Sequence, residues 1–285
     1  MRRIAVTVSA LLAAALAACS TGEPEAAASG GTPASGGGSG TSPAPTDPGV
    51  QELRVRVLER LPHDPEAFTQ GLELRGDVLY EGTGLAGSSS VRRGPAGGEP
   101  DVRRDLPAPL FGEGLTLVGP RLWQLTWQNG IAIERDADTL RERRRVRYAG
   151  EGWGLCHDGT GGSGGRLVMS DGTSRLTFRD PGTFEPTGHV DVTRDGAPVD
   201  RLNELECTPD GSVYANVYQT DTLVRIDPDT GAVTADIDAS GLLRPAEQRD
   251  GALQLNGIAA VPGGEEFLLT GKLWPRMFRV EFVPR

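Results

Sequence analysis

This 285-residue sequence repeats a short element, and residues able to carry acid–base chemistry stand at the same place in several of the repeats. Glu113 lies between Gly112 and Gly114, so the open backbone lets its carboxylate approach a ligand closely. A carboxylate in such a place can take a proton from one group and return it to another, although Glu151 offers a rival. Three of the four tryptophans stand at equivalent points, which favours a ligand pocket over simple gap filling. The substrate-binding candidates are Phe68, Gln70, Trp127, Trp153, Asn203, Tyr218, Asn256 and Trp274.

Lys272 is the only lysine in a chain with 29 basic residues, the others all being arginine. An ammonium group is a compact charge with three rotatable donors, which the planar guanidinium group does not provide. The sequence therefore favours a compact donor at Lys272, with chance as the alternative, and makes Glu113 and Lys272 the catalytic candidates.

The elements that must position these residues form five repeats. Their middle residues lie 43, 40, 51 and 52 positions apart, and each is followed by a polar turn and a second short strand. Short strands, turns rich in Gly and Asp, and this period are typical of β-propeller blades. We expect an all-β, five-bladed propeller whose innermost strands converge on one central pocket. The repeated elements are Gln70-Gly71-Leu72, Glu113-Gly114-Leu115, Trp153-Gly154-Leu155, Glu204-Leu205-Glu206 and Asn256-Gly257-Ile258.

A strand over residues 52–59 has no repeat of its own, and its apolar and polar residues alternate. We expect it to pair with the last blade near residues 277–282 and to close the ring, which leaves no long exposed edge. A six-bladed propeller with one degenerate blade is the alternative fold.

Seven motifs, taken together, resemble the papaya-type glutaminyl-peptide cyclotransferases of plants and bacteria. The resemblance covers nearly all of residues 61–283, in order, whereas any one motif alone would be a weak signal. The motifs are Phe68–Leu72, Phe111–Thr116, Gln124–Trp127, Glu151–Leu155, Met169–Thr173, Leu202–Glu206 and Gly271–Pro275.

This resemblance implies a five-bladed propeller that acts as an acyltransferase on peptides or proteins with N-terminal glutamine. The product is pyroglutamate, and ammonia is released. The family's catalytic carboxylate falls on Glu113, and its pocket residues fall on Phe68, Gln70, Trp127, Trp153, Asn203 and Lys272. Tyr218 departs from the family, which usually has tryptophan there, so we expect a changed substrate preference.

The chemistry of such a reaction suits these residue types. The α-amine attacks the amide carbon of its own side chain, so aromatic walls need only hold the folded-back form. The leaving nitrogen must be protonated, which Glu113 can do with the proton it takes from the amine. Lys272, Gln70 or a backbone N–H can stabilise the oxyanion, and Asn203 can orient the first peptide group.

Zinc chemistry finds no support, because His63, His157 and His189 are isolated and lack ligand spacing. We expect no required cofactor, while the resemblance leaves a structural calcium ion on the propeller axis open. Two other functions stay open as well. One is a propeller that binds extracellular ligands without catalysis, and the other is a lactonase-like hydrolase with a metal held by Glu113, Asn203 and Asn256.

The N-terminus predicts export. Residues 1–18 combine a basic start with an apolar run, and Cys19 follows as in bacterial lipoprotein signals, although an ordinary signal peptide is the alternative. Residues 19–49 read as a lipidated cysteine and a disordered linker, and residues 50–285 as the catalytic domain. We expect a lipoprotein on the outer face of a bacterial membrane, attached only through its lipid.

The net charge of −10 argues against nucleic acid and against electrostatic membrane binding. We expect a monomer.

Cys156 and Cys207 fall at the same place in successive repeats. An oxidising compartment permits a disulfide, but spacing does not show that the two residues meet, and we expect two separate buried thiols.

Overall fold

The computed structural model describes residues 49–160, 164–247 and 252–285. The predicted signal, Cys19 and almost all of the linker lie outside these residues. The described residues form strands and turns with no helix, which confirms the all-β class. Accordingly, they contain no helix that is long and apolar enough to cross a membrane.

Three four-stranded antiparallel sheets are each built from consecutive strands. The first contains β2 (Thr69–Arg75), β3 (Val78–Thr83), β4 (Ser90–Pro95) and β5 (Val102–Asp105). The second contains β6 (Gly112–Val118), β7 (Arg121–Thr126), β8 (Ile131–Asp136) and β9 (Glu142–Arg147). The third contains β10 (Leu155–Asp158), β11 (Arg166–Ser170), β12 (Arg175–Arg179) and β13 (Pro186–Asp191). A hairpin of β14 (Thr193–Arg194) and β15 (Ala197–Pro198) follows.

The remaining strands form one eight-stranded sheet. One half contains β16 (Leu202–Cys207), β17 (Val213–Val217), β18 (Thr222–Ile226) and β19 (Val233–Asp238). The other half contains β20 (Leu255–Ala260), β21 (Glu266–Gly271), β22 (Arg276–Pro284) and β1 (Gln51–Pro62). The first strand pairs antiparallel with β22, from Leu53 opposite Pro284 to Pro62 opposite Arg276. The predicted pairing of the first strand with the last is therefore confirmed. In addition, β1 pairs parallel with β19, which joins the two halves.

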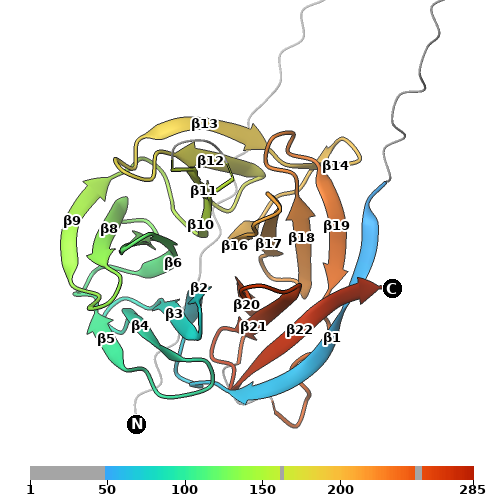
Figure 1. The fold of residues 1–285 in the computed structure, drawn as a ribbon, viewed down its shortest axis with the longest axis horizontal. Coiled ribbons are helices and arrows are strands. Elements are labelled where there is room, and N and C mark those ends of the chain that lie inside the picture. Colours follow the sequence, from blue (N-terminus) through green and yellow to red (C-terminus); the bar gives the residue numbers. More distant parts are fainter. Residues whose placement is uncertain (1–48, 161–163, 248–251) are drawn as a thin grey trace, which may run out of the picture. The chain divides into compact units, whose positions relative to one another are not determined.

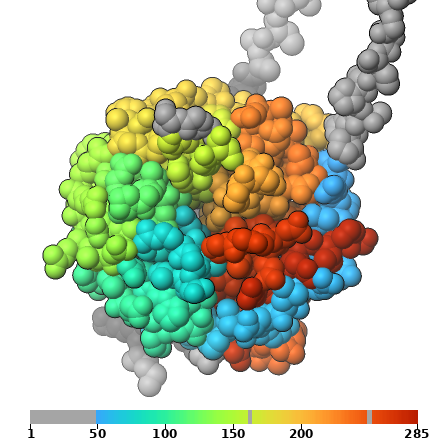
Figure 2. Space-filling view, in the orientation of Figure 1, coloured from blue at the N-terminus to red at the C-terminus, as the bar shows by residue number. Residues whose placement is uncertain are grey.

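The sheets are arranged around a common centre, with β2, β6, β10, β16 and β20 nearest to it (Figure 1). Each of these inner strands contacts the next one, and β20 contacts β2. The space-filling view shows the sheets packed side by side around the same centre (Figure 2). Apolar side chains fill the layers between sheets, as where Leu122, Tyr80 and Leu115 lie in one buried cluster.

Two glycines of the repeated elements allow the inner strands to approach one another. A Cβ atom on Gly114 would lie 2.6 Å from the carbonyl oxygen of Trp153, and one on Gly154 would lie 2.1 Å from that of Asn203. Any larger residue would push neighbouring sheets apart at the centre. The repeated glycines are therefore a packing requirement of the fold.

Cys156 and Cys207 form a disulfide bond, so the prediction of two separate thiols is wrong. Cys156 lies on β10 and Cys207 on β16, and these neighbouring inner strands bring the two Cα atoms to 5.4 Å. This separation lies within the range that a disulfide can bridge. The equivalent positions in two repeats are thus spatial neighbours.

Candidate active site

Four inner strands carry a β-bulge at the same point. The pairing register shifts between Thr69 and Gly71, between Gly112 and Leu115, between Leu202 and Leu205, and between Leu255 and Ile258. Because a bulge re-aims a side chain out of the regular alternation, these four points are suited to hold functional groups. The residues freed there include Gln70, Glu113, Asn203 and Asn256.

Glu113 lies on β6 and is 4% exposed. Its Oε1 atom accepts a hydrogen bond of 2.7 Å from Nε2 of Gln70, on the neighbouring strand β2. Its Oε2 atom is buried and has no hydrogen-bond partner among the described residues. Burial raises the pKa of Glu113 well above its ordinary value; Lys272 opposes this shift and Glu151 adds to it. The buried carboxyl group therefore holds a proton more readily than an exposed glutamate does.

Lys272 is buried in the turn that directly follows β21, and it lies close enough to Glu113 for each group to shift the pKa of the other. Its Nζ atom lies 5.0 Å from the ring centre of Phe68 and 5.2 Å from that of Tyr218. Burial lowers the pKa of Lys272 to about 8, although Glu113 acts in the opposite direction. Within the described residues the two charges interact through space without a direct ion pair.

Aromatic side chains stand around these two groups in two contacting sets. Phe68 meets Phe111 edge to face at 6.1 Å, and Phe111 meets Trp127 at 5.5 Å. Trp153 meets Tyr218 at 5.3 Å. All five rings are partly exposed, whereas Glu113 and Lys272 are buried. Phe111 was not among the predicted site residues, although its position two residues before Glu113 was a usable signal.

Glu151 links the two aromatic sets. Its Oε2 atom accepts hydrogen bonds from the indole N–H of Trp127 at 2.7 Å and of Trp153 at 3.0 Å, and its Oε1 atom accepts one from Gln128 at 2.9 Å. Burial alone would raise its pKa, but the hydrogen bonds from Trp153, Gln128 and Trp127 lower the pKa of Glu151 below its ordinary value. Both oxygens are engaged, so Glu151 orients two walls of the site and is poorly placed to exchange a proton.

Two buried asparagines complete the centre of the site. The amide nitrogen of Asn256 donates to the carbonyl oxygen of Thr69 at 3.0 Å and to Oε1 of Gln70 at 3.3 Å, so it stands behind Gln70. The side-chain oxygens of Asn203 and Asn256 are buried and have no partner among the described residues. Together with Oε2 of Glu113, they offer acceptors from three inner strands to a ligand rich in N–H groups.

Trp274 does not join this group, and its placement corrects the prediction. Leu273 has a positive φ of 61°, so the chain turns back after Lys272. The indole then covers Gly271, donates to the carbonyl oxygen of Leu253 at 2.7 Å and packs in an apolar cluster with Phe278. The described residues bring only Trp127 and Trp153 of the three predicted tryptophans to the site.

No group of three or more His, Cys, Asp or Glu residues that could hold a metal ion occurs in the described part of the chain. Two other acidic residues of the inner strands, Glu204 and Glu73, accept hydrogen bonds from backbone N–H groups. Glu204 accepts N–H groups from Leu72 at 3.0 Å and from Ile258 at 2.8 Å, and Glu73 accepts that of Leu117 at 2.9 Å. These carboxylates tie neighbouring inner strands together.

Comparison with known proteins decides the family. The model of the glutamine cyclotransferase family matches residues 31–282. The chain belongs to the glutamine cyclotransferase family. A curated glutaminyl-peptide cyclotransferase of Arabidopsis thaliana is 38% identical over 234 residues, which cover 80% of this chain and 71% of the relative. The crystal structure of the Myxococcus xanthus glutaminyl cyclase is 38% identical, has a TM-score of 0.75 and matches 83% of this chain and 99% of its own.

These matches confirm the resemblance stated on the sequence motifs. Tyr218 stands 5.3 Å from Trp153 and contacts Lys272, so an aromatic face is present where the family usually has tryptophan.

Proposed function

We propose that this protein converts the N-terminal glutamine of peptides and proteins to pyroglutamate and releases ammonia, with Glu113 as the proton carrier. The observation that carries the assignment is the state of the Glu113 carboxyl group: one oxygen is fixed by Gln70, while the other is buried and unpartnered among the described residues. Burial raises the pKa of Glu113, which favours a carboxyl group that can hold the proton between the two transfers.

In the proposed reaction, the α-amine nitrogen forms a bond to the side-chain amide carbon of the same residue. Oε2 of Glu113 takes a proton from that nitrogen and delivers it to the amide nitrogen. The bond between the amide carbon and this nitrogen then breaks, and ammonia leaves. The carboxyl group returns to its starting state, so one group serves both proton transfers.

Lys272 and the aromatic rings have complementary tasks. With a pKa of about 8, Lys272 is mostly an ammonium ion at pH 7, and it can donate to the oxygen that becomes negative in the tetrahedral intermediate. The rings of Phe68, Phe111, Trp127 and Trp153 hold the glutamine side chain in its folded-back form. Tyr218 is smaller than tryptophan and adds a hydroxyl group, so we propose that it sets which second residue the enzyme prefers.

For the fold, we infer five blades. The eight-stranded sheet then represents two blades, β16–β19 and β20–β22 with β1, which the parallel pairing of β1 with β19 links at the rim. Five inner strands in mutual contact and the pairing of β1 with β22 support a ring closed by the N-terminal strand.

We propose no zinc and no resident cofactor. For a calcium ion on the axis, which the resemblance allows, Glu204 and Glu73 are poor ligands, because both oxygens of Glu204 and one oxygen of Glu73 already accept backbone N–H groups. The proposed chemistry rests on Glu113 and Lys272 alone.

For the cellular location, we propose a lipoprotein held at the outer face of the membrane through Cys19, with a monomeric domain.

The decisive test is to incubate the purified domain with a peptide that begins with glutamine and to follow its mass. We expect the peptide to lose the mass of one ammonia molecule, and the same peptide with an acetylated N-terminus to stay unchanged, because its α-nitrogen is no longer a nucleophile. Saturable binding of the free peptide without any loss of ammonia would favour a non-catalytic binding protein instead.

A further inference from the structure

His63 stands directly after β1 and is held on both sides of its ring. Its Nδ1 atom lies 2.8 Å from the carbonyl oxygen of Trp274, and its Nε2 atom lies 3.1 Å from Oε1 of Glu81. Both partners can only accept hydrogen bonds when Glu81 is ionised, so both ring nitrogens must carry protons. His63 is therefore an imidazolium ion, although its side chain is only 4% exposed.

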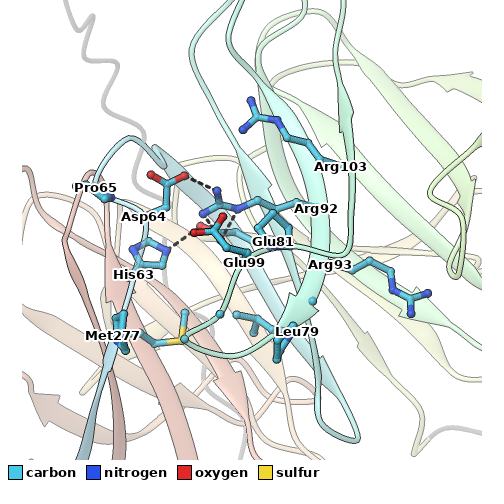
Figure 3. Close-up of a pocket in the computed structure, with 16 residues that line it drawn as sticks. His63, Asp64, Pro65, Leu79, Glu81, Arg92, Arg93, Glu99, Arg103 and Met277 are labelled. Atoms are coloured by element: carbon cyan, nitrogen blue, oxygen red, sulfur yellow. Dashed lines mark hydrogen bonds and ion pairs between the residues drawn. The ribbon is translucent and has the colours of Figure 1, made fainter.

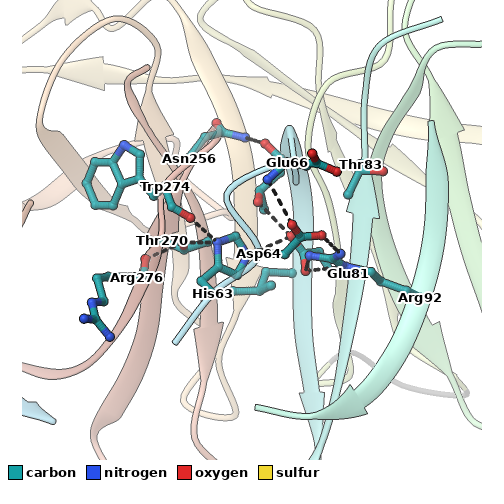
Figure 4. A network of polar contacts seen from close by, with 12 residues as sticks. His63, Asp64, Glu66, Glu81, Thr83, Arg92, Asn256, Thr270, Trp274 and Arg276 are labelled. Atoms are coloured by element: carbon teal, nitrogen blue, oxygen red, sulfur yellow. Dashed lines mark hydrogen bonds and ion pairs between the residues drawn. The ribbon is translucent and has the colours of Figure 1, made fainter. Parts of the chain in front are cut away.

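Glu81, on β3, is the centre of a buried network (Figure 4). Oε1 accepts hydrogen bonds from His63 and from the hydroxyl group of Thr69 at 2.7 Å. Oε2 faces Arg92, whose Nε and Nη2 atoms lie at 2.9 and 2.7 Å, and Arg92 also reaches Asp64 at 2.6 Å. Burial alone would raise its pKa, but His63 and Arg92 lower the pKa of Glu81 to about 2. Two cations thus face two anions.

The network connects the two segments that carry Gln70 and Lys272. Thr69 directly precedes Gln70, and the Trp274 carbonyl group that His63 holds lies two residues after Lys272. Two backbone hydrogen bonds join the same two segments. The N–H of His63 donates to the carbonyl oxygen of Pro275, and the N–H of Leu273 donates to that of Ala67. The first and the last sheet are therefore tied together directly beside the site.

The other side of the network faces a cavity of about 500 Å³. His63, Asp64, Glu81 and Arg92 line one part of it, and Leu79 and Met277 line another (Figure 3). Asp64 is 40% exposed, so the network has contact with solvent at this end. Neither Glu113 nor Lys272 lines this cavity, which is distinct from the active site.

We propose that the His63–Glu81–Arg92 network is a positioning device that sets Gln70 and Lys272 relative to Glu113. The proposal rests on the proposed function and adds residues that touch no reacting atom. Through Thr69, the network fixes the strand from which Gln70 orients the Glu113 carboxyl group. Through Trp274, it fixes the turn that follows Lys272. A small displacement of either group is costly for catalysis, since an error of about 1 Å can reduce a rate by about 100-fold.

Two variants test the proposal at different strengths. Glu81→Gln removes the central charge, whereas Thr69→Val keeps every charge and removes only the hydroxyl group that reaches Glu81. Asp158→Asn is the matched control, because Asp158 is a buried carboxylate that pairs with Arg166 and lies on β10, away from Gln70 and Lys272. Each variant is measured for kcat and KM on a glutamine peptide.

A second measurement does not depend on turnover. Because Lys272 is the only lysine, a domain labelled with [ε-¹³C]lysine gives one side-chain carbon signal that reports on the surroundings of this residue. We expect Glu81→Gln to lower kcat by about 10- to 100-fold, and Thr69→Val to lower it less, with the lysine signal displaced in both. The control should change neither kcat nor the signal.

An unchanged kcat or an unmoved lysine signal in folded Glu81→Gln would overturn the proposal, as would an equal loss of kcat in the Asp158→Asn control. If Glu81→Gln does not fold, Thr69→Val decides by the same criteria. An inactive wild-type domain would overturn the proposed function, and the displacement of the lysine signal would then decide the positioning alone.

Discussion

The side chain of Gln70 donates to Oε1 of Glu113 at 2.7 Å, across the boundary between the first and second sheets. This bond engages one oxygen of the carboxyl group and leaves Oε2 without a hydrogen-bond partner among the described residues. Gln70 is in turn held by Asn256 from the last sheet. Side chains from three inner strands therefore fix the orientation of the Glu113 carboxyl group.

Replacing Glu113 by glutamine keeps the size of the side chain and removes its exchangeable proton. We expect kcat to fall by about 10²- to 10⁴-fold, which is the usual contribution of general acid–base catalysis. Steady-state kinetics on a glutamine peptide measures this, and thermal unfolding checks that the domain is intact. Turnover within a few fold of wild type would mean that the proton travels by another route.

Glu151→Gln is the matched comparison, since it also neutralises a glutamate of the site. Glu151 orients Trp127 and Trp153, so we expect its loss to raise KM more than it lowers kcat, with a smaller effect than Glu113→Gln. The emission of the tryptophans should shift as their indole N–H groups lose a charged acceptor. A loss of kcat equal to that of Glu113→Gln would contradict the assignment of Glu113 alone as the proton carrier.

Lys272 should titrate with a midpoint of about 8. The [ε-¹³C]lysine signal measures this directly, and Glu113→Gln should lower the midpoint, because the carboxylate raises the pKa of Lys272 in the wild type. The folded state binds fewer protons than the unfolded state between about pH 8 and the ordinary lysine pKa of about 10.4, so this group makes the free energy of unfolding rise with pH across that window. A midpoint near 10.4 would show that the lysine is not buried.

The disulfide between Cys156 and Cys207 joins two inner strands 51 residues apart in the chain. Breaking it with a Cys156→Ala, Cys207→Ala double variant should lower the free energy of unfolding by about 4 kcal/mol in the loop-entropy description. Urea denaturation measures the change, and reductant should shift the wild-type midpoint without affecting the double variant. Equal midpoints for both proteins would show that the bond adds no stability.

Cyclisation of glutamine should survive zinc-selective chelators at full rate. The reason is that the proposed steps use only Glu113 and Lys272, and the described residues contain no group of three or more His, Cys, Asp or Glu that could hold a metal ion. Ammonia release with and without chelator measures this. Loss of activity that returns on addition of zinc would instead support a metal enzyme.

Cys19→Ala should move the full-length protein from the membrane fraction to the soluble exported fraction, if the lipid is its only anchor. Buried acyl chains contribute about 0.8 kcal/mol per CH₂ to membrane binding. The variant lacks these chains, and the proposed arrangement contains no other contact with the bilayer. Fractionation followed by the peptide assay checks both position and activity. An unchanged membrane fraction for the variant would contradict the lipoprotein proposal.

The repeats of the sequence were sufficient to predict an all-β fold and the place of Glu113 on an inner strand, and the unrepeated strand over residues 52–59 predicted the pairing of the first strand with the last. The catalytic roles of Glu113 and Lys272 stay predictions. What could not be predicted depends on relations between strands. A β-bulge such as that at Glu113 is defined by the register of its partner strand, and the Cys156–Cys207 bond by the spacing of two inner strands. Trp274 was misplaced because a positive φ at Leu273, a residue that rarely adopts it, turns the chain.

The network around His63 escaped prediction for a related reason. The sequence shows His63 as an isolated histidine, because Glu81 and Arg92 lie on later strands and the Trp274 carbonyl group comes from the far end of the chain. Only the folded chain brings these four groups together.

The placement of β1 between β19 and β22 also orders events during synthesis. The strand made first has both of its partners among the strands made last, so it waits as an unpaired edge until the C-terminal strand has left the ribosome and, if the protein is exported, the translocation channel. Contacts of such long sequence separation slow folding. A chain that ends before β22 would keep its first strand open to other molecules, so we expect premature termination to produce an aggregating species rather than a smaller enzyme.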